Sequence, residues 1–268
     1  MMRYLLTTLI LLAAATSATA HEYWFEPDNF FVKTGGKTNI HLYVGEALKM
    51  DEERPFQAAK TDSFQLFSNF GTFDLRSMAE DDKAPVLTFG GDKSGTYLMS
   101  MERSWSYITL EPEKFKDYLN DEGMSYIIAE RKKRGESSKD GRERYRRYLK
   151  TILQVGESHD ASAKKRVGSR LEIVALDNPY TKKVGGKIKF QVFFDGFPLI
   201  DYAVFADNRD DKNYVTQKLT TDKKGKITVK LDHKGIWLVR LVYMQHCEKN
   251  CGDADWESFW GALSFGLR

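Results

Sequence analysis

A short pattern occurs twice in this chain, 150 residues apart, and it limits the folds open to the sequence. Residues 35–37, Gly-Gly-Lys, come before apolar side chains at every second position from Ile40 to Val44, and residues 185–187, again Gly-Gly-Lys, come before the same alternation from Phe190 to Phe194. A second echo joins residues 93–98 with 233–238. Alternation with a period of two is typical of a half-buried β-strand. Two echoes in the same order predict two related β modules.

Most of the chain outside residues 111–170 has the same character. Short alternating segments are divided by Gly, Asp and Ser turns, as at 86–89 and 97–101. Aromatic residues make up 13% of the chain, with Phe and Tyr prominent, and such side chains suit pleated, half-buried sheets. We therefore expect a mainly β fold with two immunoglobulin-like or transthyretin-like β-sandwich modules, at residues 21–110 and 171–268.

Between these modules the period changes to that of a helix. Pro112 suits a first helical turn, and Phe115, Tyr118 and Leu119 follow at helical spacing. A second helix is expected at about 142–155, where aromatic and aliphatic side chains form one stripe and basic side chains another. Residues 111–155 are thus predicted to form a helical hairpin, followed by a linker at 156–170 that is rich in Gly, Ser, Ala and Lys.

The first 20 residues have the features of a secretory signal. Arg3 is followed by an apolar run from Leu5 to Ala15, and Ala18-Thr19-Ala20 has the small side chains of a cleavage site. The apolar run has 11 residues, whereas crossing a bilayer takes roughly 20. We expect cleavage after Ala20, a periplasmic mature protein without a membrane span, and His21 as its first residue.

The net charge and the absence of known catalytic motifs limit the classes of function expected for this chain. Lys and Arg number 41 against 38 Asp and Glu, and loss of Arg3 leaves 40 against 38. Nucleic-acid-binding proteins usually have a pronounced basic excess, so no nucleic-acid partner is expected. The sequence has no His-Glu-x-x-His, no Gly-x-Ser-x-Gly and no phosphate-binding loop, and no catalytic residues are predicted. We do not expect an enzyme.

His21 is the first candidate for chemistry, because cleavage after Ala20 would give it a free α-amine beside its imidazole. These two nitrogens can chelate one Ni, Co or Cu ion, and His41 or His246 could supply a further nitrogen. Each residue also has a plainer interpretation. His21 would merely follow the cleavage site, His41 would be a half-exposed strand histidine, and His246 would belong to a solvated acidic loop.

Cys247 and Cys251 are the only two cysteines of the chain. In an oxidising compartment, two cysteines so close in sequence form a disulfide more often than a thiolate site. The alternative is a reduced pair that would suit a soft metal ion.

The sequence resembles an exported bacterial family, the domain of unknown function 4198, some of whose members are described as the periplasmic component of cobalt or nickel uptake. The matching stretches, in order along the chain, are 21–27, 44–46, 144–150, 154–156, 178–180, 195–199 and 255–260. The resemblance implies a periplasmic protein with an immunoglobulin-like C-terminal part and a link to divalent transition metals. It implies no catalytic residues, and Cys247 and Cys251 are outside its pattern.

Two hypotheses follow. The first is a periplasmic binding protein for nickel, cobalt or copper that assists uptake or handling of the ion, with a metal transporter or an outer-membrane receptor as partner. The second is a non-catalytic envelope adaptor, in which the two modules and a basic helical hairpin bind a glycan or another protein.

Overall fold

The computed structural model describes residues 22–268. The predicted signal segment and His21 lie outside these residues. Within the described part the fold is mainly β, as the alternation predicts, with several antiparallel sheets and two short α-helices. None of the helices in this part of the chain has the length and apolar character that crossing a bilayer requires.

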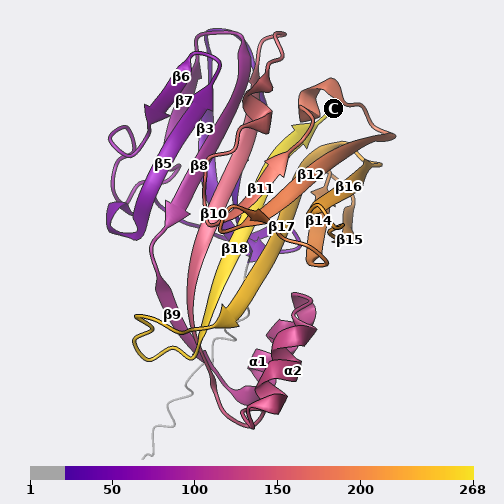
Figure 1. Cartoon of the computed structure of the whole chain (residues 1–268). Helices are drawn as coiled ribbons and strands as arrows, with labels where there is room; N and C mark the ends of the chain where they lie inside the picture. Colours follow the sequence, from indigo (N-terminus) through magenta and orange to yellow (C-terminus); the bar gives the residue numbers. More distant parts are fainter. Residues whose placement is uncertain (1–21) are drawn as a thin grey trace, which may run out of the picture.

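The first module begins with eight strands. They are β1 (Glu22–Pro27), β2 (Phe31–Val32), β3 (Gly36–Glu46), β4 (Lys49–Glu53), β5 (Thr61–Ser68), β6 (Gly71–Asp74), β7 (Leu87–Gly91) and β8 (Gly95–Arg103), and Figure 1 labels β3 and β5 to β8 among them. Strand β9 (Ser106–Leu110) then leads to α1 (Pro112–Asp121) and α2 (Ser125–Lys133), and the long strand β10 (Gly141–Val155) follows.

The second module repeats this order of strands. It contains β11 (Leu171–Ala175), β12 (Gly186–Phe194), β13 (Phe197–Pro198), β14 (Ala203–Arg209), β15 (Tyr214–Thr220), β16 (Lys226–Leu231) and β17 (Gly235–His246), and it ends with β18 (Trp256–Leu267). Three short 3₁₀ helices lie at Ala58–Lys60, Ala161–Lys164 and Pro179–Thr181.

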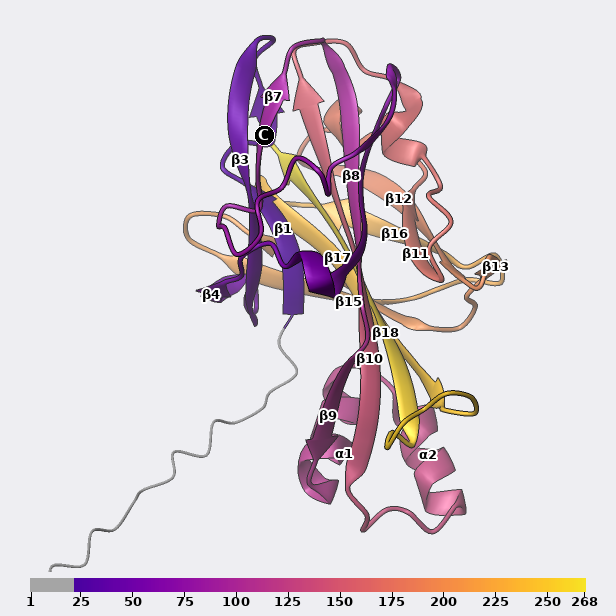
Figure 2. The same ribbon diagram turned by 90° about the vertical axis from the view of Figure 1, so that its left-hand side faces the viewer.

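One large sheet runs through both modules, in the order β15-β14-β17-β18-β10-β8-β5-β6. The order is symmetric about its centre, because β17, β14 and β15 stand to β18 as β8, β5 and β6 stand to β10. We call β10 and β18 the seam strands. They pair in parallel, Glu143 opposite Trp256 and Thr151 opposite Ser264, and Figures 1 and 2 show them side by side through the middle of the molecule.

Two smaller sheets cover opposite faces of the large one. Strands β1, β3, β4 and β7 form the first, and β11, β12, β13 and β16 the second. Leu149 and Leu153 of β10 belong to the core under the first small sheet, whereas Tyr148 and Ile152 belong to the core under the second. Successive side chains of a strand point to opposite faces, so the seam strand β10 serves both cores.

The repeat seen in the sequence marks equivalent strands of the two modules. The first Gly-Gly-Lys run leads into β3 and the second into β12, each paired with its neighbours in its own small sheet. The second echo begins β8 and β17, at Gly95 and Gly235. Two related β modules are therefore present, joined through the seam strands.

The predicted helix at 142–155 is wrong, because these residues form most of β10. The strand is buried at every position from Tyr148 to Val155. A strand buried on both faces loses the alternation of apolar and polar residues that identifies a half-buried one. The expected linker also contains a 3₁₀ helix, whose N-cap Asp160 accepts a hydrogen bond from the Thr96 backbone nitrogen at 2.9 Å.

The two helices lie within 112–133 and cover one end of the seam strands (Figure 2). Phe115 and Leu119 of α1 pack with Ile127 of α2, and with Met244 and Trp256 of the strands, in a third hydrophobic core. Pro112 occupies the first turn of α1, where its missing N–H would have no helical partner. This end of the molecule forms one wall of the site described next.

Candidate functional site

The histidines predicted as metal ligands have different surroundings. His41 lies on β3, and both of its ring nitrogens contact carboxylates: Nε2 is 2.8 Å from Asp28 Oδ1 and Nδ1 is 2.7 Å from Glu53 Oε1. Burial acts to lower the pKa of His41, but the hydrogen bonds to Glu53 and Asp28 outweigh it and raise that pKa. Because each ring nitrogen already contacts a carboxylate, His41 has no free nitrogen for a metal.

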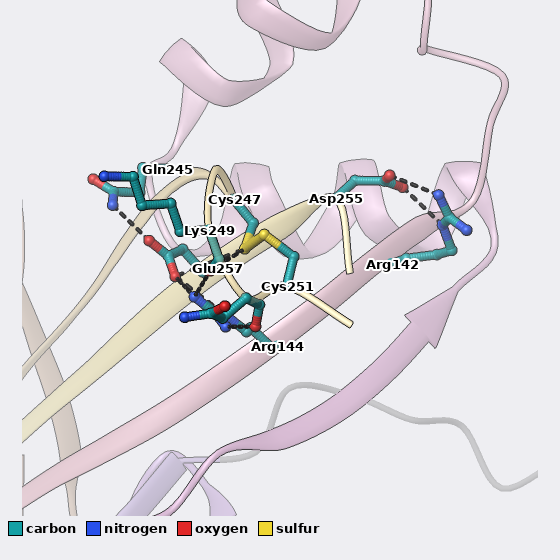
Figure 3. The surroundings of a disulfide bond; sticks show 9 residues. Arg142, Arg144, Gln245, Cys247, Lys249, Cys251, Asp255 and Glu257 are labelled. Carbon is teal, nitrogen blue, oxygen red and sulfur yellow. Dashed lines mark hydrogen bonds and ion pairs between the residues drawn. A yellow bond between two sulfur atoms is a disulfide. The ribbon is translucent and has the colours of Figure 1, made fainter. Parts of the chain in front are cut away.

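His246 ends β17 and packs edge-on against Trp256, with 5.4 Å between the ring centroids. The loop that follows is closed by a disulfide between Cys247 and Cys251 (Figure 3). Arg144 of β10 reaches this loop and donates to the backbone oxygens of Lys249 and Asn250. The loop is therefore held both by its own disulfide and by hydrogen bonds to the seam strand β10.

Two acidic residues near that loop pair with arginines (Figure 3). Arg144 forms a buried ion pair with Glu257, and Arg142 forms a bidentate pair with Asp255, at 2.7 and 2.9 Å. In the described residues no group of three or more His, Cys, Asp or Glu side chains could hold a metal ion. The metal-binding prediction therefore rests on His21 and stays a prediction.

A different set of residues lines a cleft of about 310 Å3 beside the seam strands. Its walls come from β1, β3, β9 and β10, with Trp260 of β18 and Tyr118 of α1. In the part of the chain that the structure describes, four basic side chains and one acid, Glu143, line it. The basic residues are Arg54, Lys60, Arg103 and Arg147.

Three of these basic groups surround Tyr23 of β1. The guanidinium carbons of Arg147 and Arg103 lie 4.5 and 5.6 Å from the centre of its ring, and Arg54 is close enough for its charge to lower the pKa of the Tyr23 hydroxyl, which burial raises. Burial lowers the pKa of Arg103, and the charges of Arg147 and Arg54 lower it further. We call Arg54, Arg103 and Arg147 the arginine triad.

Each arginine of the triad has a buried nitrogen without a hydrogen-bond partner. These atoms are Nε of Arg54, Nη1 of Arg103 and Nε of Arg147. Arg103 is only 8% exposed, and its other terminal nitrogen donates to Gln57 Oε1 at 2.7 Å. Arg54 pairs with Glu52 at 2.9 Å, whereas Arg103 and Arg147 have no carboxylate within ion-pair distance among the described residues. Like charges close together with unused donors are unfavourable without an anion, so this arrangement is suited to binding one.

Aromatic rings hold Arg147 in place. Its guanidinium lies 4.6 Å from the Tyr145 ring centre and 5.5 Å from that of Trp260, besides its contact with Tyr23. In the described residues no carboxylate lies within ion-pair distance of it, although the charge of Arg147 lowers the pKa of Glu143. Cation–π contacts position a guanidinium without neutralising its charge.

Glu143 lies at the floor of the cleft and is almost fully buried. Its Oε1 accepts hydrogen bonds from the Tyr118 hydroxyl at 3.3 Å and from the Ser258 hydroxyl. Burial raises the pKa of Glu143 to about 7, against these hydrogen bonds. The group can thus gain or lose a proton near neutral pH.

We expect Glu143→Gln to flatten the pH dependence of stability. The folded-state pKa of about 7 lies above the ordinary 4.5, so the folded state holds a proton that the unfolded state has released, and wild-type stability falls as pH rises from 4.5 through 7. Gln keeps an acceptor for Tyr118 and Ser258 but cannot ionise. Urea denaturation at pH 8 should show a gain of up to about 3 kcal/mol.

The exposed Glu113→Gln in α1 is the matched control and should leave the pH profile unchanged. If the unfolding free energy of Glu143→Gln changed with pH between 5 and 7 as it does in the wild type, Glu143 would not be the source of this pH dependence.

A second charged cluster lies beside the cleft, where Arg240 of β17 contacts three carboxylates. Its Nε is 2.7 Å from Asp207 Oδ2 and 2.8 Å from Glu22 Oε1, and its Nη1 is 3.1 Å from Glu122 Oε2. Burial raises the pKa of Glu22 to about 7 and also raises that of Glu122, while Arg240 opposes both shifts. One positive charge therefore faces three acids.

Sequence reasoning missed the cleft. The arginine triad is spread over residues 54, 103 and 147, which only the sheet brings together. One local signal was present: with a period of two, Glu143, Tyr145 and Arg147 fall on the same face. In the helix predicted at 142–155, residues two apart would not share a face, so this signal was missed.

The sequence matches the family described as "Domain of unknown function (DUF4198)" over residues 18–245. No curated protein matches the chain. A solved structure of three N-terminal domains of the bacteriophage RB49 Highly Immunogenic Outer Capsid protein (Hoc) aligns with 91% of this chain at 9% sequence identity and a TM-score of 0.21. The chain spans 59% of that structure. Because the family match extends over most of the sequence, the chain belongs to the DUF4198 family, whose function is unknown.

Proposed function

We propose that this protein is a non-catalytic envelope protein that binds an anionic small molecule in the cleft around Tyr23. The observation that carries the proposal is the arginine triad, with one buried, unpartnered nitrogen on each member. A buried donor without an acceptor costs about 1–3 kcal/mol, and more when it is charged. A carboxylate, phosphate or sulfate would supply both the acceptors and the opposite charge, and guanidinium groups match the geometry of such anions.

The size and walls of the cleft support a small ligand. Its volume of about 310 Å3 is at the lower end of the range for small-molecule sites, roughly 300–1,000 Å3. Tyr23, Tyr145 and Trp260 offer flat apolar surfaces beside the cations. Such a site takes a molecule with an acidic group and a compact body, for example an acidic sugar or a short organic acid.

The test is a titration of the mature protein with sulfate, phosphate, citrate and glucuronate. Tryptophan fluorescence is a suitable signal because Trp260 lines the cleft, and calorimetry measures the affinity. We expect at least one anion to bind with a Kd below about 1 mM. Arg147→Met should weaken that binding about 10–100-fold, as expected for the loss of a hydrogen bond to a charged group.

The matched control is Arg142→Met, five positions earlier on the same strand, where the side chain is exposed and pairs with Asp255. This variant should bind the anion as the wild type does. Arg147→Met should be no less stable to urea without ligand, since it removes one of three mutually repelling charges. Failure of every anion to bind, or equal affinity in Arg147→Met, would overturn the proposal.

A further inference from the structure

A second, much smaller cavity adjoins the cleft. Tyr23, Arg147 and Trp260 line both spaces, so little more than these side chains separates them. The small cavity measures about 20 Å3, and space of that size holds one water molecule or a group as small as an ammonium. Glu22 and Glu122 are among the residues that line it.

The charged side chains that line this cavity are two acids, Glu22 and Glu122, and two arginines, Arg147 and Arg240, whereas the cleft has one acid. Arg240 is the only cation within ion-pair distance of Glu22, Glu122 and Asp207 in the described residues. Among residues 22–268, no hydrogen-bond partner lies near the buried Oε2 of Glu22, and the whole residue is only 6% exposed. The carboxylate thus has an unused acceptor in a cavity that it lines.

We infer that the ligand of the cleft is a zwitterion, in which an acidic group contacts the arginine triad and an ammonium group reaches Glu22. This inference rests on the proposed function and names the chemical class of its ligand. An ammonium would supply the donor that Glu22 Oε2 lacks and the positive charge that the acids around Arg240 need. A ligand with only an acidic group would provide neither this donor nor this positive charge.

The arrangement also limits the form of the zwitterion. Arg54 and Arg103 line only the cleft and Glu22 lines only the small cavity, with the side chains of Tyr23, Arg147 and Trp260 at the boundary. The ammonium and the acidic group must therefore be separated by several bonds. Linear ω-amino acids and short peptides have this form.

The experiment compares matched pairs of ligands by calorimetry on the mature protein. Butyrate, valerate and hexanoate are titrated beside 4-aminobutyrate, 5-aminovalerate and 6-aminohexanoate. At one chain length we expect the amino acid to bind at least about tenfold more tightly than the plain acid, as a charged hydrogen bond would provide. Its N-acetyl derivative, which has no positive charge, should lose that gain in the wild-type protein.

Glu22→Gln provides the second arm of the experiment. Gln keeps an oxygen for Arg240 but removes the negative charge, so the gain from the amino group should disappear while affinity for the plain acid stays the same. Glu113→Gln, an exposed acid on α1, is the control. Equal affinities of amino and plain acids would overturn the zwitterion and leave anion binding intact. If neither series binds while sulfate, phosphate, citrate or glucuronate does, the zwitterion is overturned and anion binding stands. If none of these anions binds either, both proposals fail.

Discussion

Replacing Lys150 by Met is expected to lower the free energy of unfolding by about 3–5 kcal/mol. Lys150 lies on the seam strand β10, 5% exposed, with its Nζ 2.6 Å from Oε1 of the fully buried Glu172 in β11. Burial lowers the pKa of Lys150, and Glu172 opposes the shift. Without the ammonium, a buried carboxylate would lose its closest positive charge.

Glu172 keeps some support in that variant. Its oxygens accept hydrogen bonds from the backbone nitrogens of Val167 and Gly168, at 2.6 and 3.2 Å, and Arg166 lies 3.6 Å away. The double variant Lys150→Met/Glu172→Gln leaves no unpaired buried charge, since Arg166 is exposed, and should therefore recover part of the loss. Urea denaturation of the wild type and both variants measures the difference. A single variant as stable as the double one would show that the buried charge matters little.

Replacing Arg240 by Met should destabilise the protein by about 3–5 kcal/mol at pH 8. Three carboxylates then face one another without a cation, and Asp207 and Glu22 are both buried. The loss should shrink as pH falls below 7, because the pKa of Glu22 is already raised to about 7 in the wild type and protonation removes its charge. Urea denaturation between pH 5 and 8 tests both parts.

Arg134→Met is the control for this effect. Arg134 pairs with Glu130 on the exposed face of α2, and such a surface pair contributes about 0.3–0.5 kcal/mol. A pH-independent loss in Arg240→Met would indicate that the packing of the side chain, rather than its charge, accounts for the effect.

Half-buried strands could be predicted from the sequence because one face is buried and the other exposed, so apolar and polar residues alternate. β3 alternates between Ile40, Leu42 and Val44 inside and His41 and Tyr43 outside. The two modules were predictable for the same reason, since their echoes lie in strands of this kind. β10 was not, because Leu149 and Ile152 belong to different cores, and a segment that is apolar on both sides has no visible period.

The candidate site was less predictable than the fold. The sequence points to His21 as the first candidate for chemistry, and this residue lies outside the described residues. Tyr23, two positions later, is the residue around which the arginine triad gathers. Nothing local in the sequence connects Tyr23 with Arg54 or Arg103, because the sheets determine their proximity.

The position of β18 also sets the timing of folding. The last strand in the chain lies at the middle of the large sheet, between β10 and β17. Its Ala262 belongs to one core and its Phe259 and Leu263 to the other. During synthesis, which starts at the N-terminus, neither core can be completed until β18 has been made. Until then, β10 has an unpaired edge that other chains can join. The final 12-residue strand therefore decides when the molecule as a whole becomes folded.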